Sequence, residues 1–183
     1  GEKHFLRGNH DERLWLFRNN AVGLVRDYAH DGIKRFEGHV RRWGARMLPY
    51  DSRHGVLRIG HLKIVHGYHI GLHSASMHAR VYGNCLFGHT HVAMVFRLAG
   101  RALGLLTPGD EGVALDSEAK YLVNPGSVGQ PRDSDPRAAY AIFDAEAHRV
   151  EMYRIEYPVA VTQQKMAEAG LPEPLIRRLA AGR

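Results

Sequence analysis

Three short segments of the chain combine a potential metal ligand with a glycine, and each directly follows an apolar run. The segments are Gly8-Asn9-His10-Asp11, Val65-His66-Gly67 and Gly88-His89-Thr90-His91. The apolar runs 4–6, 62–65 and 85–87 predict β-strands, and loops at strand ends on one edge of a sheet are where α/β proteins gather their chemistry. Glycine lets the backbone turn sharply there and leaves room for an ion and a substrate. Three imidazoles and one amide suit Mn, Fe or Zn better than Ca or Mg, so the sequence predicts a metal site.

These segments, in this order, resemble the second half of the calcineurin-like metallophosphoesterase pattern. That pattern runs D-x-H, G-D-x-x-D, G-N-H-[DE], [V/I]-H-G and G-H-x-H, and the chain carries the last three. No Asp stands two residues before a His anywhere in the chain, and Gly109-Asp110 lacks the second acid of its motif. We therefore expect the chain to be the C-terminal portion of a larger domain. Two strands and a crossover helix, ~30 residues or more, would precede Gly1.

The resemblance implies a ligand set and a mechanism. Asn9, His66 and His89 would bind one divalent ion, and His91 would complete a second, with Mn, Fe, Zn and Ni as candidates. The ions would lie ~3.5–4 Å apart, and a metal-bound hydroxide would attack a phosphate mono- or diester in line. His10 would face the substrate and act as general acid for the leaving oxygen. The bridging Asp of the family is absent from this chain, so we expect the chain alone to be weakly active or inactive.

A second loop, 124–132, reads Asn-Pro-Gly-Ser-Val-Gly-Gln-Pro-Arg and resembles the loop that follows the metal motifs in small bacterial phosphodiesterases of this family. Its glycines permit exposed amides, and its arginine supplies a planar fork for phosphate oxygens. The alternative is a rigid turn that only shapes the rim of the site. The predicted substrate-binding residues are Asn124, Ser127, Arg132 and, beside the first motif, Arg13. For His69, His73 and His78 we expect a solvated or substrate-facing role rather than a third metal.

The pattern of elements predicts an α/β fold. Asp11 is expected to cap a helix with an apolar face formed by Leu14, Trp15, Phe17, Val22 and Val25, and further helices are expected over 33–47 and 74–82. Strands are expected over 3–7, 56–59, 62–65 and 84–87. Later strands are expected within 92–106, 121–123, 139–143 and 150–157, with a glycine- and aspartate-rich loop over 107–117. The resemblance implies a four-layer αββα sandwich of two mixed sheets flanked by helices. We expect one domain over 1–183, with residues 159–183 as a helical tail and an unpaired apolar sheet edge where strands are missing.

Composition narrows the class of protein. The 183 residues, 44% of them hydrophobic, fit a single domain, and no apolar stretch approaches the ~20 residues that span a bilayer. A lone cysteine, Cys85, rules out an internal disulfide and fits the reducing cytoplasm, with the thiol packed in a strand. The net charge of +6 is spread without a dense run. A small phosphate ester or nucleotide is therefore the expected partner, and nucleic acid is not favoured; the oligomeric state stays open.

The leading hypothesis is a dinuclear metal-dependent phosphoesterase, a hydrolase of the phosphatase or phosphodiesterase type, and two alternatives compete with it. A non-catalytic scaffold could keep the fold and lose the chemistry, although retention of Asn9, His10, His66, His89 and His91 argues against that. A nucleic-acid-processing subunit would require a continuous basic groove beside the metal loops.

Overall fold

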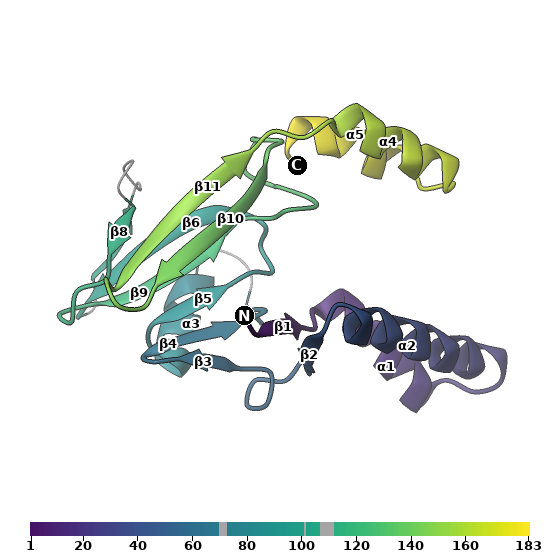
Figure 1. Ribbon diagram of the computed structural model, residues 1–183, viewed down its shortest axis with the longest axis horizontal. Coiled ribbons are helices and arrows are strands. Elements are labelled where there is room, and N and C mark those ends of the chain that lie inside the picture. The colour runs from purple at the N-terminus through teal and green to yellow at the C-terminus, as the bar shows by residue number, and fades with distance from the viewer. Residues whose placement is uncertain (70–72, 101, 107–111) are drawn as a thin grey trace.

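The structure of the chain is a computed structural model that describes residues 1–69, 73–100, 102–106 and 112–183. Five helices and eleven strands are present in these residues (Figure 1). The helices are α1 Asn9–Asn20, α2 Leu24–Arg42, α3 Ser74–Tyr82, α4 Val159–Glu168 and α5 Glu173–Ala181. The strands are β1 Lys3–Leu6, β2 Ala45–Leu48, β3 Leu57–Ile59, β4 Leu62–Val65, β5 Cys85–Phe87, β6 Ala93–Ala99, β7 Ala102–Leu106, β8 Val113–Ala114, β9 Lys120–Pro125, β10 Ala138–Asp144 and β11 Arg149–Ile155.

The largest sheet has six strands in the order β3-β4-β5-β9-β6-β7. Its central strands β4, β5 and β9 are parallel, with Ile64 opposite Leu86 and Leu86 opposite Val123. The carboxyl ends of these three strands therefore meet at one edge, and the loops that begin at His66, Gly88 and Gly126 leave the sheet together. This register places the sequence motifs side by side.

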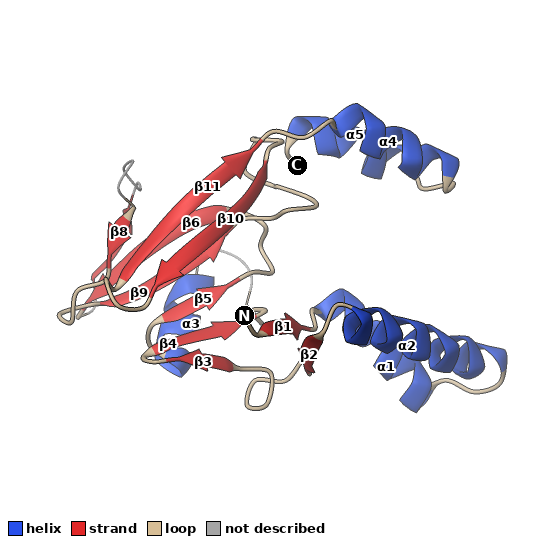
Figure 2. Cartoon of the chain, viewed as in Figure 1, coloured by secondary structure: helices blue, strands red, loops and turns tan. Residues whose placement is uncertain are grey.

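Two hydrophobic clusters hold the layers together. Helix α3 covers one face of the six-stranded sheet, where Ala75, Ala79 and Tyr82 pack against Phe87 and Leu122. On the opposite face the smaller sheet, β10-β11-β8, packs its inward side chains against β6 and β9 (Figure 2). The predicted α/β fold with flanking helices is confirmed. The larger sheet is mixed, as predicted, whereas the smaller sheet is antiparallel throughout its described strands.

The fourth layer of the predicted sandwich is incomplete in the part of the chain that the structure describes. The outer face of the smaller sheet carries Tyr140, Ile142, Tyr153 and Ile155, which are between 37% and 51% exposed. Tyr140 stacks on Tyr153 across the strands, with ring centroids 5.1 Å apart. Helices α4 and α5 extend from the end of this sheet instead of covering its face (Figure 1).

The N-terminal helices differ from the sequence prediction. The expected apolar face Leu14, Trp15, Phe17, Val22 and Val25 does not exist, because the chain breaks at 21–23 and starts α2 at Leu24 after a glycine with φ of 59°. Of the five, only the tryptophan is buried.

The helix predicted over 33–47 ends early, and this prediction was wrong at its end. Helix α2 stops at Arg42, and Ala45–Leu48 forms β2, parallel to β1 with Phe5 opposite Met47. Pairing with a strand forty residues away outweighs the helical spacing of the apolar residues, because it satisfies the backbone of both strands.

The C-terminal residues form the predicted helical tail, broken between α4 and α5 at Gly170 and Pro172. The end of α5 is attached to the loop after β9: the Ser134 amide donates to the Gly182 carbonyl oxygen at 2.9 Å. Gly182 has a φ of +60°, and a Cβ there would lie 2.6 Å from the Asp135 nitrogen. In the described residues, no helix is long and apolar enough to cross a bilayer.

Candidate metal centre

Three predicted ligands converge at the carboxyl edge of the sheets. Asn9 Oδ1, at the first turn of α1, lies 3.1 Å from His66 Nε2 and 3.2 Å from His89 Nδ1. The two imidazole rings stand edge to face, with centroids 5.3 Å apart. His66 and His89 lie 57 and 80 positions after Asn9 in the chain. The parallel register of β4 and β5 brings the two histidines together, and Asn9 reaches them from the end of β1 in the separate β1-β2 sheet.

The donor set fits a divalent transition metal. Ligands bonded at ~2.1 Å to a shared ion lie ~3.0 Å apart in octahedral and ~3.4 Å apart in tetrahedral geometry, and the distances from Asn9 Oδ1 fall in this interval. Among the described residues, no three side chains of His, Cys, Asp or Glu form a metal-binding group by themselves. The group reaches three donors only through the asparagine amide oxygen.

Glycines allow this close approach. A Cβ on Gly8 would lie 2.6 Å from Cε1 of the His66 ring, so any larger residue would displace the imidazole. Gly67, at a φ of +104°, would place a Cβ 3.1 Å from the Cβ of His89. These two contacts explain why the first and second motifs need glycine beside their ligands.

The loop 88–91 holds its histidines in a strained conformation. His89 and His91 have φ values of 69° and 62°, in the left-handed region that costs a non-glycine residue ~1–3 kcal/mol. Asn124, fully buried, holds the loop in place: its Nδ2 donates to the Gly88 carbonyl at 2.9 Å and to Thr90 Oγ1 at 2.8 Å. Its Oδ1 accepts from the Gly126 amide at 2.9 Å. All of the Asn124 amide is used inside the fold, so the structure assigns it a positioning role in place of the predicted substrate contact.

His91 is oriented by the loop after β9. Its Nδ1 lies 2.8 Å from the Gln130 carbonyl oxygen, so Nδ1 carries the proton and Nε2 keeps its lone pair. Metal-ligating histidines typically donate their second ring nitrogen in this way. The Arg132 amide donates to the His91 carbonyl at 3.0 Å, and its exposed guanidinium touches only Gln130 Oε1 among the described residues. Ser127 Oγ accepts from the Gln130 amide at 2.9 Å and so shapes the same turn.

Burial keeps the clustered imidazoles neutral. Burial, followed by the charge of His89, lowers the pKa of His66 to about 4. Burial is also the largest cause that lowers the pKa of His89 and of His91, with Arg132 contributing to both. Metal binding requires neutral imidazole, so the fold prepares these side chains to bind an ion near neutral pH.

Comparisons with known proteins identify the family of the chain. The family model described as the calcineurin-like phosphoesterase superfamily domain matches residues 2–148. The chain belongs to the calcineurin-like phosphoesterase superfamily. It is similar to the crystal structure of a metallophosphoesterase from Sphaerobacter thermophilus, with a TM-score of 0.59 and 41% identity, covering 70% of this chain and 57% of that one.

Two further proteins that are similar to the chain carry less functional information. The uncharacterized protein MJ0912 of Methanocaldococcus jannaschii is 43% identical over 103 residues, which are 56% of this chain and 41% of that protein. The hypothetical protein PH1004 of Pyrococcus horikoshii is 16% identical over 98% of this chain and 73% of its own, at a TM-score of 0.58, and shows the fold alone. The chain spans about two fifths of its curated relative's length and 57% of the Sphaerobacter chain.

The two remaining polar residues of the first superfamily motif, His10 and Asp11, have different surroundings. His10 is exposed at the start of α1, and its charge acts on His66, His89 and His91. Asp11 caps α1, as predicted, but from inside the helix, since Oδ2 accepts from the Gly8 amide at 2.8 Å.

The two arginines near this motif differ in burial. Arg7 is only 7% exposed, stacks 3.9 Å from the Trp15 ring centroid and pairs with Glu12 at 3.1 Å. Through these two contacts, Arg7 stabilises helix α1 from its buried side. Arg13 is exposed on α1, and its substrate contact stays a prediction.

His78 departs from the expectation for the histidine-rich stretch. It is fully buried, its Nδ1 donates to the Ser74 carbonyl at 2.7 Å, and its Nε2 accepts from the Tyr68 amide at 3.1 Å. Both nitrogens are therefore used to attach α3 to the loop after His66, and the predicted solvated or substrate-facing role is wrong for this residue. His69 lies half-buried, 5.1 Å from the His78 ring, and His73 is exposed.

The structure adds an aromatic wall that the sequence reasoning missed. Tyr50 lies edge-on to His66 with ring centroids 5.8 Å apart, and Tyr68 follows at 4.9 Å from Tyr50. Burial raises the pKa of Tyr50, so the phenol stays protonated. A lone tyrosine after a proline gives no signal in the sequence, because its place depends on how β2 returns to the metal loops.

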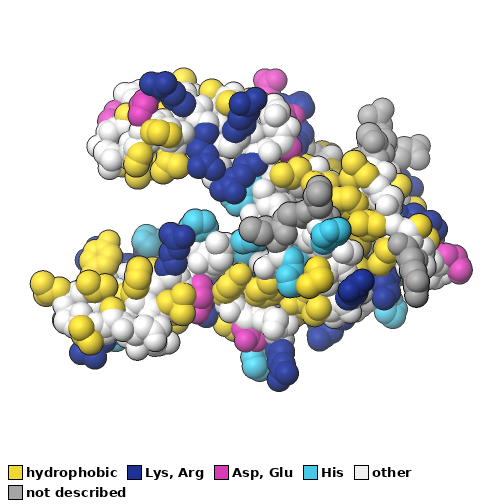
Figure 3. All heavy atoms as spheres, turned by 180° about the vertical axis from the view of Figure 1, so that it is seen from behind, with side chains coloured by type: hydrophobic (Ala, Val, Ile, Leu, Met, Phe, Trp, Pro, Cys, Tyr) yellow, Lys and Arg dark blue, Asp and Glu magenta, His cyan; other side chains and the backbone are white. Residues whose placement is uncertain are grey.

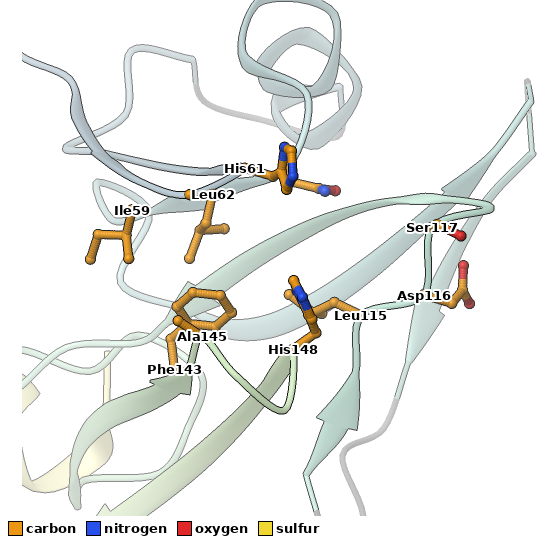
Figure 4. Close-up of a pocket in the computed structure, with 11 residues that line it drawn as sticks. Ile59, His61, Leu62, Leu115, Asp116, Ser117, Phe143, Ala145 and His148 are labelled. Atoms are coloured by element: carbon orange, nitrogen blue, oxygen red, sulfur yellow. The ribbon is translucent and has the colours of Figure 1, made fainter.

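A separate cavity of about 460 Å³ lies at the other end of the strands (Figure 4). His61 and His148 approach it from opposite sides, between Leu62, Leu115 and Phe143. His61 precedes β4 and His66 follows it, so ~13 Å of strand separates this cavity from the metal ligands.

Residues 107–111, which hold Gly109-Asp110, lie outside the described residues.

Proposed function

We propose that the chain is the ligand-bearing part of a dinuclear metal-dependent phosphoesterase that hydrolyses phosphate mono- or diesters, nucleotides included. The observation that carries the proposal is the convergence of Asn9 Oδ1, His66 Nε2 and His89 Nδ1 within about 3.2 Å. A scaffold protein would gain nothing from two strained histidines and a buried asparagine that holds them.

The residues take distinct roles in this proposal. Asn9, His66 and His89 would hold one divalent ion, and His91, through Nε2, would contribute to a second. When bound, such ions supply an acidified water and neutralise charge on the phosphate. His10, exposed at the mouth of the site, protonates the leaving oxygen. Arg132 binds a phosphate oxygen with its planar fork.

The test measures Mn²⁺-dependent hydrolysis of bis(p-nitrophenyl) phosphate. It compares the chain, and the chain extended by any residues its gene encodes upstream of Gly1, with His89→Ala and with the control His61→Ala. The proposal predicts activity in the extended protein that falls at least about 100-fold in His89→Ala and less than about twofold in the control. Absence of activity from the extended protein, or equal loss in the two variants, would favour the scaffold alternative.

A further inference from the structure

The loop after β9 and the C-terminal helix α5 bring two arginines together beside the metal loops. The Arg132 amide is bonded to the His91 carbonyl at 3.0 Å, and two residues later the Ser134 amide is bonded to the Gly182 carbonyl at 2.9 Å. Arg178 lies one helical turn before Gly182, on the last turn of α5. This chain of backbone contacts fixes α5 to the His91 loop.

The charges of Arg132 and Arg178 act on each other across the contact between the loop and α5. The charge of Arg178, after burial, lowers the pKa of Arg132, and it also acts on His91. Two like charges held together by the fold cost free energy unless an anion compensates them.

Neither guanidinium pairs with an Asp or Glu side chain among the residues that the structure describes. Arg132 donates to Gln130 Oε1 at 3.0 Å, and Arg178 Nε donates to the main-chain oxygen of Arg183, the last residue of the chain, at 2.9 Å. The acidic residues nearby in sequence are already paired: Asp133 with Arg154, and Asp135 with Arg137 at 2.6 Å. Among the described residues, no Asp or Glu side chain is therefore left to compensate Arg132 or Arg178.

The surface beside helices α4 and α5 is hollowed. Figure 3 shows a deep cleft between the α4–α5 lobe and the α1–α2 lobe, with Lys and Arg side chains gathered on the side of the α4–α5 lobe that faces the cleft and histidines below them. The cleft gives a substrate room to extend from the histidines toward α5.

We propose that Arg132 and Arg178 form a clamp for a second phosphate group of the substrate, so that the site prefers a small molecule with two separate phosphates. This inference rests on the proposed function, because it places the first phosphate at the histidine loops. Guanidinium groups bind phosphate oxygens through paired, charge-assisted hydrogen bonds. Two arginines make a subsite for one group, whereas a nucleic-acid strand would need a longer basic track.

Helix α5 offers a matched control in the neighbouring arginine. Arg177 is exposed and pairs with Glu173 on its own helix at 2.8 Å. Arg177→Ala removes the same charge from the same helix and leaves the pair of Arg132 and Arg178 intact. Arg178→Lys keeps the charge but loses the planar fork, so it distinguishes a specific clamp from a general field.

The test is calorimetric binding, in the presence of Mn²⁺, of adenosine 3′,5′-bisphosphate and of adenosine 5′-monophosphate, measured without reference to turnover. The wild-type chain is expected to bind the bisphosphate about 10-fold more tightly. Arg178→Ala should weaken bisphosphate binding by about 5- to 30-fold and monophosphate binding by less than about twofold. The bisphosphate affinity of Arg178→Lys should lie between those of the wild type and Arg178→Ala, and the affinity of Arg177→Ala should match that of the wild type.

Several outcomes would overturn the clamp. They are equal binding of the two ligands by the wild type, equal weakening of both ligands in Arg178→Ala, or the same loss in Arg177→Ala. Tighter binding of a single-stranded hexanucleotide than of the bisphosphate would replace the small-molecule ligand with nucleic acid. Because binding is read directly, a protein that binds the bisphosphate but hydrolyses nothing would refute the proposed function and not the clamp.

Discussion

The two ends of the parallel strands β4, β5 and β9 both carry histidines, yet only one end is built as a reactive site. At the carboxyl end, glycines admit the imidazoles to close contact, two histidines are held at positive φ, and a buried asparagine fixes the loop. At the amino end, His61 and His148 border a cavity of about 460 Å³ with apolar walls. His148 also has a positive φ, 48°, but it lies in the exposed turn between β10 and β11, where such a conformation is common.

A cavity in this molecule is therefore a poorer guide to a reactive site than a strained and closely packed backbone. Strain and close packing have a free-energy cost and persist where surrounding contacts impose them. The cavity at the amino end shows neither feature in its lining residues other than His148, although two histidines line it. The two ends of the strands should therefore respond differently to substitution.

The largest effect is expected from Gly8→Ala. The new Cβ would stand 2.6 Å from His66 Cε1 and must displace the ring, and a misplacement near 1 Å can cost about 100-fold in rate. The control is Gly38→Ala on α2, where a Cβ would meet only Arg42 Nη1 at 3.8 Å. Rates of bis(p-nitrophenyl) phosphate hydrolysis in the extended protein that fall alike in both variants, or in neither, would contradict the packing argument.

Two asparagines, one at each end of the parallel strands, give the sharpest test of how the two ends differ. Asn124→Ala leaves the Gly88 carbonyl and the Thr90 hydroxyl without their donor, which should cost ~1–3 kcal/mol of stability and weaken Mn²⁺ binding about 10-fold. At the amino end, Asn84 Oδ1 accepts from the Tyr121 amide at 2.8 Å.

Asn84→Ala should therefore lower the thermal midpoint without changing Mn²⁺ affinity. Thermal unfolding and metal titration of both variants measure the two quantities separately. Unchanged metal affinity in Asn124→Ala would show that the buried amide does not position the histidine loop.

The smallest effect concerns the pH dependence of stability in metal-free protein. Folding lowers the pKa of His66 from 6.5 to about 4, so the unfolded chain takes up this proton first as the pH falls. The stabilisation is complete above about pH 6.5 and is lost as the pH falls toward 4. Because the ring is partly exposed, the loss is about 1–2 kcal/mol.

His66→Gln removes this contribution, so its free energy of unfolding should fall less steeply than that of the wild type between pH 7 and 4. Urea unfolding at several pH values in EDTA measures the difference. Parallel curves for the two proteins would mean that His66 titrates alike in the folded and unfolded states.

The sequence predicts elements well where local pattern and burial agree. The bounds of β4 and α3 match the prediction residue for residue, and the strand-end argument correctly brings Asn9, His66 and His89 together. Strand β2 was missed because its pairing partner lies at the other end of a helical hairpin.

Positioning residues were harder to predict than ligands. Asn124 and His78 read as polar groups available to a substrate, but both point inward and satisfy backbone groups. Arg178 reads as an ordinary helical charge, because its proximity to Arg132 depends on the contact between Ser134 and Gly182. The extent of the domain over 1–183 and the substrate contacts of Ser127, Arg132 and Arg13 stay predictions.

The most direct test of the metal centre is anomalous diffraction from crystals soaked in Mn²⁺. An anomalous peak is expected within bonding distance of Asn9 Oδ1, His66 Nε2 and His89 Nδ1, and it should be absent from His89→Ala crystals. A peak between His61 and His148 with none at the carboxyl end would contradict it, as would an empty site in protein saturated with Mn²⁺.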